Sequence, residues 1–314
     1  MSLAIVFPGQ GSQSVGMLKD FYATYPLVKD AFQKAAEVLG YDLWQIIAAG
    51  EADELNRTEV TQPAMLMAGY ICWRVWQENN GPTPDYMAGH SLGEYTALVC
   101  AGALSIEDAL ALVAERGRLM QMAVAEGEGA MAAILGLDDE RVIQACQQAA
   151  QGEVVEAVNF NSPGQVVIAG QKTAVQRAID LLKQTGAKRA LLLPVSVPSH
   201  CQLMRDAASS LAEKLATIEI NPPVIPVIHN VDVAAHASAD EIRSVLQQQL
   251  YNPVRWVEII GSMSSHGVDT IVECGPGKVL VGLCKRIDKT INGLPVFDPD
   301  SLANTLASLQ ESGS

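Results

Sequence analysis

A serine that could act as a nucleophile stands between two glycines in the segment Gly89-His90-Ser91-Leu92-Gly93. Residues 84–88 before this segment predict a short buried strand, and residues 94–103 after it predict a helix. Glycines on both sides of Ser91 let the backbone turn sharply, which exposes the serine hydroxyl. The amide N–H of Leu92 then lies at a helix N-terminus, where it can stabilise developing negative charge. We interpret Ser91 as a nucleophile; the alternative is a glycine-rich turn with a solvated serine.

A serine hydroxyl is a poor nucleophile at neutral pH and needs an adjacent base, and the chain has five histidines. His200 is the candidate, because it stands at a predicted strand-to-helix junction and follows the serine in the chain, as in hydrolase-like enzymes. The alternative is a helix-capping or core histidine. His90 adjoins the serine at a sharp turn, so we expect its side chain to point away from that of Ser91. The other histidines flank a loop or end a helix: His229, His236 and His266.

No acidic residue between the serine and His200 is well placed to complete a catalytic triad. Candidates such as Asp138, Asp139 and Asp180 fall in a stretch that we assign to a second domain. This absence argues against an ordinary triad hydrolase. A backbone carbonyl could instead hold the imidazole in the required tautomer.

Two further segments hold residues that could contact a substrate. The apolar run 3–7 predicts a strand of a parallel sheet, and Gln10 lies in the glycine-containing loop just past its carboxyl end, where ligands bind in open α/β sheets. That loop could also be an ordinary strand-to-helix turn. Arg116 stands in an otherwise apolar helix, where an arginine usually extends to solvent or makes a structural ion pair.

The order of predicted elements indicates an α/β protein of two domains. Residues 127–195 follow a βαββαβ pattern, which is typical of a ferredoxin-like domain. We predict that this domain is inserted into a hydrolase-like large domain with a central parallel sheet, formed by residues 1–126 and 196–314, and that the substrate cleft lies between the two. Within the large domain we expect a helix opened by Pro63, a helix 203–216 capped by Ser199 or His200, a strand 224–229 and a helix 254–266.

Composition restricts the possible partners and location. The chain has 314 residues, 49% of them hydrophobic, and a formal net charge of −14, which argues against binding nucleic acid or an anionic membrane. Six cysteines are scattered without a Cys-x-x-Cys pair, so we expect buried free thiols in a reducing cytoplasm and no zinc site. We expect no signal peptide, and no membrane span, because charged residues interrupt the longest apolar stretch, Thr96 to Ala114.

Together, these motifs resemble those of the malonyl-CoA:acyl carrier protein transacylases of fatty acid synthesis. The resemblance extends over nearly the whole chain, in the same order. The matching stretches are Phe7-Pro8-Gly9-Gln10-Gly11-Ser12-Gln13, Thr61-Gln62-Pro63-Ala64, Gly89-His90-Ser91-Leu92-Gly93-Glu94-Tyr95, Glu115-Arg116-Gly117, Asn159-Phe160-Asn161-Ser162-Pro163-Gly164-Gln165, Pro198-Ser199-His200-Cys201, Leu250-Tyr251-Asn252-Pro253-Val254 and Glu273-Cys274-Gly275-Pro276-Gly277.

The resemblance implies a ping-pong reaction without a cofactor, in which malonyl-CoA and holo acyl carrier protein are the substrates. Ser91 attacks the thioester carbonyl and becomes acylated. His200 takes the serine proton and passes it to the thiol of coenzyme A. The carbonyl of Gln249 holds His200, and the amide N–H groups of Gln10 and Leu92 form the oxyanion hole.

The resemblance also implies how the acyl group is recognised. Arg116 binds the free malonyl carboxylate in a two-pronged ion pair. The side chains that line the acyl pocket are Gln62, Met120 and Gln165. In acyltransferase domains of polyketide synthases, serine at the position of Ser199 accompanies methylmalonyl, but discrete malonyl transferases also carry serine there. Leu92, an apolar neighbour of the nucleophile, favours malonyl.

Acyl carrier proteins are strongly acidic, and so is this chain, so the resemblance requires a local basic patch. The candidates are Lys188, Arg189, Lys278, Lys285 and Arg286, which could equally be solvated surface residues. Three other functions remain open on the sequence: a serine thioesterase or other hydrolase, a non-catalytic subunit that binds acyl carrier protein, and a discrete acyltransferase that serves a polyketide synthase.

Overall fold

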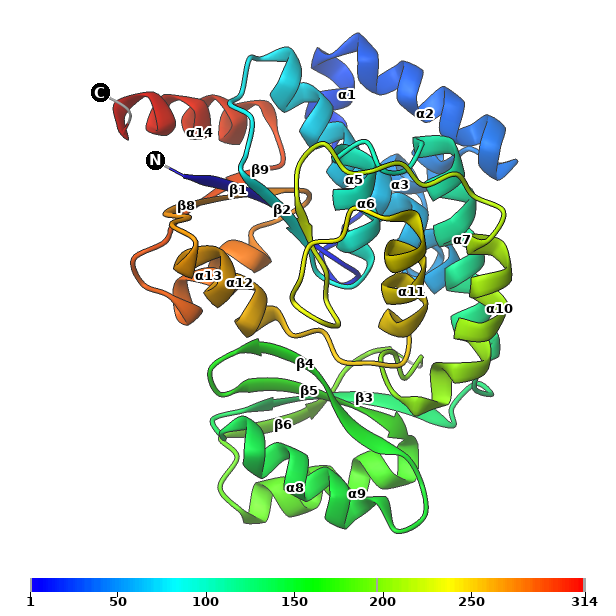
Figure 1. Ribbon diagram of the computed structural model, residues 1–314. Helices are drawn as coiled ribbons and strands as arrows, with labels where there is room; N and C mark the ends of the chain where they lie inside the picture. Colours follow the sequence, from blue (N-terminus) through cyan, green and yellow to red (C-terminus); the bar gives the residue numbers. More distant parts are fainter. Residues whose placement is uncertain (1, 196, 313–314) are drawn as a thin grey trace.

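The computed structural model describes residues 2–195 and 197–312, which form an α/β fold with two separate sheets (Figure 1). The first sheet is parallel throughout, with the strand order β7-β2-β1-β8-β9. Its strands are β1 (Leu3–Phe7), β2 (Tyr86–Gly89), β7 (Val227–Ile228), β8 (Thr270–Cys274) and β9 (Asn292–Val296). The central parallel sheet expected from the sequence is therefore confirmed.

Strand β1 lies in the middle of this sheet and is buried along its whole length. Alternate side chains of a strand point to opposite faces, so Ile5 and Phe7 enter one hydrophobic core while Ala4 and Val6 enter another. Helices cover both faces, which explains why the strand is a continuous apolar run rather than an alternating one.

The large domain contains most of the helices. The first group comprises α1 (Lys19–Thr24), α2 (Pro26–Leu39), α3 (Leu43–Ala49), α4 (Ala52–Leu55), α5 (Thr58–Glu78), α6 (Leu92–Cys100) and α7 (Ile106–Met122). The second group comprises the 3₁₀ helix η1 (Gln202–Met204), α10 (Arg205–Leu215), α11 (Ala239–Gln249), α12 (Trp256–Ser265), α13 (Val279–Ile287) and α14 (Pro299–Ser312).

The long helix α5 begins five residues earlier than expected, at Thr58 instead of Pro63. Arg57 is the N-cap, and its carbonyl accepts the first hydrogen bonds of the helix, from the N–H groups of Val60 and Thr61 at 2.8 Å each. Pro63 therefore lies inside the helix, where its missing N–H removes a single backbone hydrogen bond. The earlier start places Gln62 in a buried helical turn.

Three other expected elements are shorter than the sequence pattern indicated. The strand expected at 224–229 is reduced to β7, which follows Pro226, a residue with no N–H to donate. The helix expected at 203–216 divides into η1 and α10, and no side chain caps either one, so Ser199 and His200 are not caps. The helix expected at 254–266 begins at Trp256, because Val254 pairs with the small domain: its N–H donates to the carbonyl of Val158 at 2.8 Å.

The second sheet is antiparallel and has the strand order β4-β5-β3-β6. With the helices that connect its strands, it forms the predicted ferredoxin-like βαββαβ unit. The elements are β3 (Gly129–Leu135), α8 (Asp139–Ala150), β4 (Val155–Ser162), β5 (Gln165–Gln171), α9 (Lys172–Gln184) and β6 (Arg189–Leu192).

Helices α8 and α9 cover the outer face of this sheet, so the opposite face turns toward the large domain (Figure 1). Met131 and Val167 on that inner face pack with Cys201 of the large domain. The expected limits of the inserted domain, 127 and 195, stay a proposal, which the ends of β3 and β6 support. All six cysteines are buried and unpaired, as expected.

Candidate active site

Ser91 occupies the tight turn between β2 and α6, with backbone angles φ 52° and ψ −109°. A non-glycine residue at positive φ is strained and persists only where its surroundings hold it. The flanking glycines are required by close contacts: a Cβ on Gly89 would lie 1.8 Å from the carbonyl carbon of Gly93, and one on Gly93 would lie 2.0 Å from the carbonyl oxygen of Phe7. The predicted strand–turn–helix arrangement is confirmed.

His200 lies beside the serine, with 2.7 Å between its Nε2 and the Ser91 Oγ. Its Nδ1 lies 2.7 Å from the backbone carbonyl oxygen of Gln249. Because a carbonyl can only accept a hydrogen bond, Nδ1 must carry the proton and Nε2 is left to accept the proton of the serine hydroxyl. The structure thus brings together a nucleophile and a base, and a carbonyl takes the place of an acidic residue.

His200 is 3% exposed, and burial lowers its pKa to about 3, with the positive charge of Arg116 as the second cause. Because this pKa lies far below neutrality, the imidazole is neutral at ordinary pH, as a general base must be before it takes a proton. The backbone of His200 is also held in an unusual conformation, with φ 66° and its N–H donating to the carbonyl of Leu250 at 2.9 Å.

Arg116 extends from α7 into the same site and is 1% exposed. Its Nη1 donates to the Oε1 of Gln62 at 2.9 Å, and its Nη2 donates to the Oε1 of Gln249 at 3.0 Å and to the Ser91 Oγ at 3.3 Å. The guanidinium also lies 5.3 Å from the ring centre of Tyr95. Arg116 therefore neither extends to solvent nor forms an ion pair with a described residue.

The guanidinium is a buried charge without a direct carboxylate partner among residues 2–195 and 197–312. Its Nε has no hydrogen-bond partner at all in this part of the chain. A buried cation that lacks a counter-charge is costly, unless an anionic ligand supplies one. The site is therefore suited to an acyl group that carries a negative charge near its thioester.

A cavity of about 300 Å³ lies between the two domains in front of these residues. Met120 and Gln165 line it, as expected for the acyl pocket. Apolar side chains of the small domain and of α13 form the opposite wall, and Val279 is half exposed at its edge. Further residues that line the cavity include Gln10, His90, Leu92, Asn161, Leu193, Ser199 and Leu283.

Gln62 does not line the cavity, contrary to the expectation. It lies behind Arg116, with its Oε1 on the guanidinium and its Nε2 3.4 Å from the Sδ of Met120. The reason is the early start of α5, which places Gln62 in a buried turn packed against α7. Gln62 can fix the guanidinium but does not face the substrate space.

Gln10 and Leu92 both line the cavity, on either side of Ser91. The loop after β1 packs directly on the serine turn, since a Cβ on Gly9 would lie 2.5 Å from the carbonyl oxygen of His90. Within the described chain the amide N–H groups of Gln10 and Leu92 have no hydrogen-bond acceptor. Two such donors beside a nucleophile are what an oxyanion hole requires.

Sequence reasoning missed several polar residues around the turn. His90 does point away from the serine hydroxyl, but its Nε2 lies 2.8 Å from the Oδ1 of Asn161, and its ring packs on Trp256. Asn230 is fully buried and contacts the Gly89 carbonyl and the Ser91 N–H, on the amino side of the nucleophile. Its position just after β7, beside the carboxyl end of β2, is the signal that could have indicated it.

The candidate basic residues lie at the borders of the cavity. Lys278 precedes α13, Lys285 and Arg286 lie in its last turn, and this helix contributes Leu283 to the cavity wall. Arg286 donates to the Oε1 of Gln165 at 2.7 Å. The other two lie at the start of β6: Lys188 just precedes this strand and Arg189 is its first residue, four positions before Leu193 of the wall.

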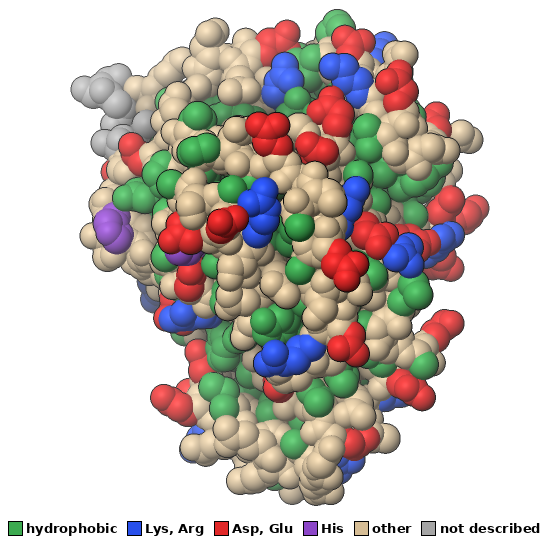
Figure 2. Space-filling view, turned by 45° about the vertical axis from the view of Figure 1, so that its right-hand side comes forward, with side chains coloured by type: hydrophobic (Ala, Val, Ile, Leu, Met, Phe, Trp, Pro, Cys, Tyr) green, Lys and Arg blue, Asp and Glu red, His purple; other side chains and the backbone are tan. Residues whose placement is uncertain are grey.

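Acidic residues lie beyond the opposite end of the cleft. A neighbouring hollow shares Gln10 with the cavity and is lined by three acidic residues, Asp53, Glu59 and Glu126, and by one basic residue, Arg57, which pairs with Glu59. On the face shown in Figure 2, acidic and basic side chains are mixed and no broad basic region appears. Any attraction for an acidic protein must therefore be local.

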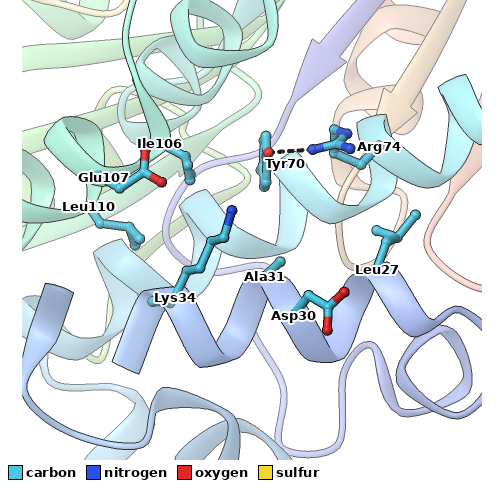
Figure 3. Close-up of a pocket in the computed structure, with 10 residues that line it drawn as sticks. Leu27, Asp30, Ala31, Lys34, Tyr70, Arg74, Ile106, Glu107 and Leu110 are labelled. Atoms are coloured by element: carbon cyan, nitrogen blue, oxygen red, sulfur yellow. Dashed lines mark hydrogen bonds between the residues drawn. The ribbon is translucent and has the colours of Figure 1, made fainter. Parts of the chain in front are cut away.

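Another hollow, of about 420 Å³, lies between α2, α5 and α7, away from the serine (Figure 3). Lys34 of α2 extends into it, and the hydroxyl of Tyr70 accepts a hydrogen bond from Arg74 at 2.7 Å. Asp30 and Glu107 stand at its edge. It contains neither a nucleophile nor a histidine.

In the part of the chain that the structure describes, no three side chains of His, Cys, Asp or Glu are grouped as a metal site would require. No helix there is long and apolar enough to span a membrane.

The fold and site together define an enzyme class: an α/β acyltransferase that works through an acylated serine.

Comparison with known proteins gives the family. The sequence pattern of the acyl transferase domain matches residues 4–296. The chain is 56% identical over 303 residues to malonyl CoA-acyl carrier protein transacylase of Escherichia coli (strain K12), an alignment that covers 96% of this chain and 98% of that protein. This chain belongs to the acyl transferase family, and the resemblance drawn from its motifs is confirmed.

Solved structures agree with this assignment. An acyl carrier protein S-malonyltransferase from Vibrio cholerae is 58% identical, with a TM-score of 0.95 and coverage of 97% of this chain and 100% of that one. A malonyl-transacylase in complex with a type II PKS acyl-carrier protein is 54% identical, with a TM-score of 0.97 and coverage of 98% and 100%.

Proposed function

We propose that this enzyme transfers the malonyl group from malonyl-CoA to the phosphopantetheine thiol of acyl carrier protein, and so supplies fatty acid synthesis. The observation that carries the proposal is the buried guanidinium of Arg116, which lies 3.3 Å from the Ser91 Oγ and has no carboxylate partner among the residues that the structure describes. A malonyl thioester presents a carbonyl to the serine and a free carboxylate to the arginine. The relatives from Escherichia coli and Vibrio cholerae are named for the same transfer.

In the first half-reaction, the Ser91 Oγ attacks the thioester carbonyl while its proton passes to the Nε2 of His200. The amide N–H groups of Gln10 and Leu92 stabilise the oxyanion. As the tetrahedral intermediate collapses, the C–S bond breaks and His200 gives the proton to the coenzyme A sulfur. The carbonyl of Gln249 keeps Nδ1 protonated, so that His200 can carry the proton in both directions.

In the second half-reaction, the carrier's pantetheine thiol takes the place of the first thiol. It gives its proton to the Nε2 of His200 and attacks the malonyl-serine carbonyl. The bond to the Ser91 Oγ breaks, and the serine recovers the proton from His200. Because one site serves both thioesters in turn, we expect ping-pong kinetics.

Pocket residues support a small dicarboxylic acyl group. Arg116 is fixed by Gln62 and Gln249, so it can present its remaining N–H groups to a carboxylate in a two-pronged contact. Met120 and Gln165 line the space around the acyl group. Ser199 also lines the cavity, as does the apolar Leu92; we propose that malonyl is preferred to methylmalonyl.

We propose that the acidic carrier protein docks on the side of the cleft that α13 and β6 form. The basic residues there are Lys188, Arg189, Lys278, Lys285 and Arg286. The acidic hollow beyond Gln10, at the other end, would repel an acidic partner. The complex of a similar transacylase with its acyl-carrier protein supports a carrier protein as the partner.

We also propose that the enzyme needs no cofactor or metal, because the serine, the base and the oxyanion donors suffice for acyl transfer. The proposal also places the enzyme in the cytoplasm, which the six unpaired cysteines support. A role in a polyketide pathway is a second candidate, because one similar structure is the transacylase partner of a type II PKS carrier protein.

Intact-mass measurement after brief mixing with malonyl-CoA, acetyl-CoA or methylmalonyl-CoA, with and without holo acyl carrier protein, tests the proposal. We expect a malonyl adduct that is absent from Ser91→Ala and moves to the carrier when the carrier is present. If no adduct forms, or if water removes it as fast without the carrier, the enzyme is a hydrolase. Separate transfer to a fatty acid carrier and a polyketide carrier distinguishes the two pathways.

A further inference from the structure

The strained backbone of Ser91 is clamped on both sides by side chains from distant parts of the chain. On the amino side, the Ser91 N–H donates to the Oδ1 of Asn230 at 2.8 Å, while the Nδ2 of Asn230 donates to the carbonyl of Gly89 at 2.7 Å. On the carboxyl side, the Nε2 of Gln249 donates to the Ser91 carbonyl at 2.9 Å. These contacts fix both peptide groups of the nucleophile.

A single carboxyl group, that of Glu94, holds both clamps. Its Oε2 accepts from the Nε2 of Gln249 at 2.8 Å and from the backbone N–H of Asn230 at 3.0 Å. Its Oε1 lies 2.7 Å from the Nδ1 of His229, the residue before Asn230. Glu94 is 0% exposed, and so is each of the three residues that it contacts.

Such burial is costly for a carboxyl group, and nothing in the acyl-transfer steps requires Glu94 to touch the substrate. It does not line the cavity, and it reaches Arg116 only through Gln249, whose Oε1 accepts from the guanidinium at 3.0 Å. Two of its contacts are instead made with the residues that hold Ser91, Asn230 and Gln249, and the third is with His229. A strained conformation persists only where its surroundings over-determine it.

We propose that Glu94 is a positioning residue for the nucleophile: through Asn230 and Gln249 it holds the Ser91 backbone in the conformation that aims Oγ at His200. The inference rests on the proposed role of Ser91. Glu94 should therefore affect the reactivity of Ser91 toward every acyl donor, and it should not affect recognition of the malonyl carboxylate.

Glu94→Gln tests this proposal, because an amide keeps the shape but turns one acceptor oxygen into a donor that faces the donors of Gln249, Asn230 or His229. The rate constant for Ser91 acylation is measured by rapid quench and intact mass, with malonyl-CoA, with acetyl-CoA and with a fluorophosphonate. The adduct formed at long times counts the folded active sites. Glu273→Gln is the matched control. Glu273 is also fully buried, but it does not hold either clamp residue; its carboxyl group accepts a hydrogen bond from the backbone N–H of Val281.

We expect Glu94→Gln to slow acylation per active site by on the order of 100-fold with all three reagents, because small misplacement of a reacting atom has effects of that size. The KM for malonyl-CoA should change little, and Glu273→Gln should keep rate constants near those of the wild type. In a double-mutant cycle, Asn230→Ala and Glu94→Gln together should lose less than the product of the single losses, since both act through one clamp.

A wild-type rate per active site in Glu94→Gln would overturn the proposal, and so would a loss confined to malonyl-CoA, which would place Glu94 in carboxylate recognition. Multiplicative losses in the cycle would also contradict it. If wild-type Ser91 reacts with the fluorophosphonate but with neither thioester, the proposed function fails while the positioning role is still measured by the fluorophosphonate arm.

Discussion

Arg116 and Gln249 share a hydrogen bond of 3.0 Å between Nη2 and Oε1, and this bond joins the residue that we propose for acyl recognition to the residue that holds His200. Gln249 uses its backbone carbonyl for His200 and its side chain for Arg116, for the Ser91 carbonyl and for Glu94. One residue at the end of α11 therefore fixes the positions of the nucleophile, the base and the cation relative to one another.

Replacing Arg116 with alanine should leave Ser91 able to accept an acyl group while reducing its preference for malonyl over acetyl. The loss of a buried contact between opposite charges predicts about a 100-fold fall in the ratio of the two kcat/KM values. Arg118→Ala is the control, because Arg118 lies on the same helix but is 48% exposed and paired with Glu115. An unchanged ratio in Arg116→Ala would remove Arg116 from acyl recognition.

Acylation by malonyl-CoA should show no loss of rate that is due to His200 as the pH falls from 8 to 5. The cause is the pKa of His200, which burial and the neighbouring Arg116 lower to about 3, so the free enzyme keeps a neutral base across that range. The measurement is kcat/KM for malonyl-CoA against pH. A limb centred near the ordinary histidine pKa would show that the base is solvated.

The same pKa predicts how His200 affects stability. Its folded-state pKa lies below the ordinary value of 6.5, so the unfolded chain binds a proton that the folded chain does not as the pH falls from about 6.5 toward 3. Stability from this group is therefore full above pH 6.5 and decreases with acid. His200→Gln should reduce the slope of unfolding free energy against pH in that window, as urea melts can measure; an unchanged slope would contradict the lowered pKa.

Gly93→Ala should destabilise the fold by at least about 3 kcal/mol, because the new Cβ would meet the Phe7 carbonyl oxygen at 2.0 Å and neither backbone can move without disturbing the sheet. Gly261→Ala is the matched control, since its Cβ would have no neighbour within 4 Å in the middle of α12. That variant should gain up to about 1 kcal/mol from helix propensity. Equal melting temperatures of the two variants would contradict the close contact.

Lys285→Glu should raise the KM for holo acyl carrier protein by about three- to tenfold at low salt, with a smaller effect at high salt, because the contact is electrostatic. Lys34→Glu makes the same charge change in the hollow of Figure 3, away from the serine, and should leave this KM near that of the wild type. Equal effects of the two substitutions would mean that only the net charge matters and that the proposed docking side is wrong.

The sequence was sufficient for the main architecture because its strands, its glycine turns and its βαββαβ order are local patterns. It was sufficient to predict the sharp turn at Ser91, because the motif and the strand and helix around it are contiguous in the sequence. It placed the start of α5 wrongly, because proline favours the first turn of a helix but is tolerated further inside at the loss of one hydrogen bond, which is where Pro63 lies. The assignment of Gln62 to the pocket wall came from the family resemblance, which does not show that the side chain lies behind Arg116.

The clamp residues were missed for a different reason. Glu94 and Asn230 are separated by 136 positions and meet only because β7 lies beside β2 in the folded sheet. No periodicity connects them, and a buried carboxyl group after a nucleophile motif is indistinguishable from a helix-start residue without the fold. The contact between Val254 and the small domain was hidden in the same way.

The carbonyl that holds His200 has a consequence for the lifetime of the acyl-enzyme. Burial, and after it the charge of Arg116, lowers the pKa of His200 to about 3, and a carbonyl dipole offsets this fall less than a full carboxylate would, so His200 is a weak base. A thiol, with an ordinary pKa near 8.5, gives up its proton to such a base far more readily than water, with a pKa of about 15.7. In the proposed mechanism, the weakness of the base therefore protects the malonyl-serine from hydrolysis until a thiol arrives.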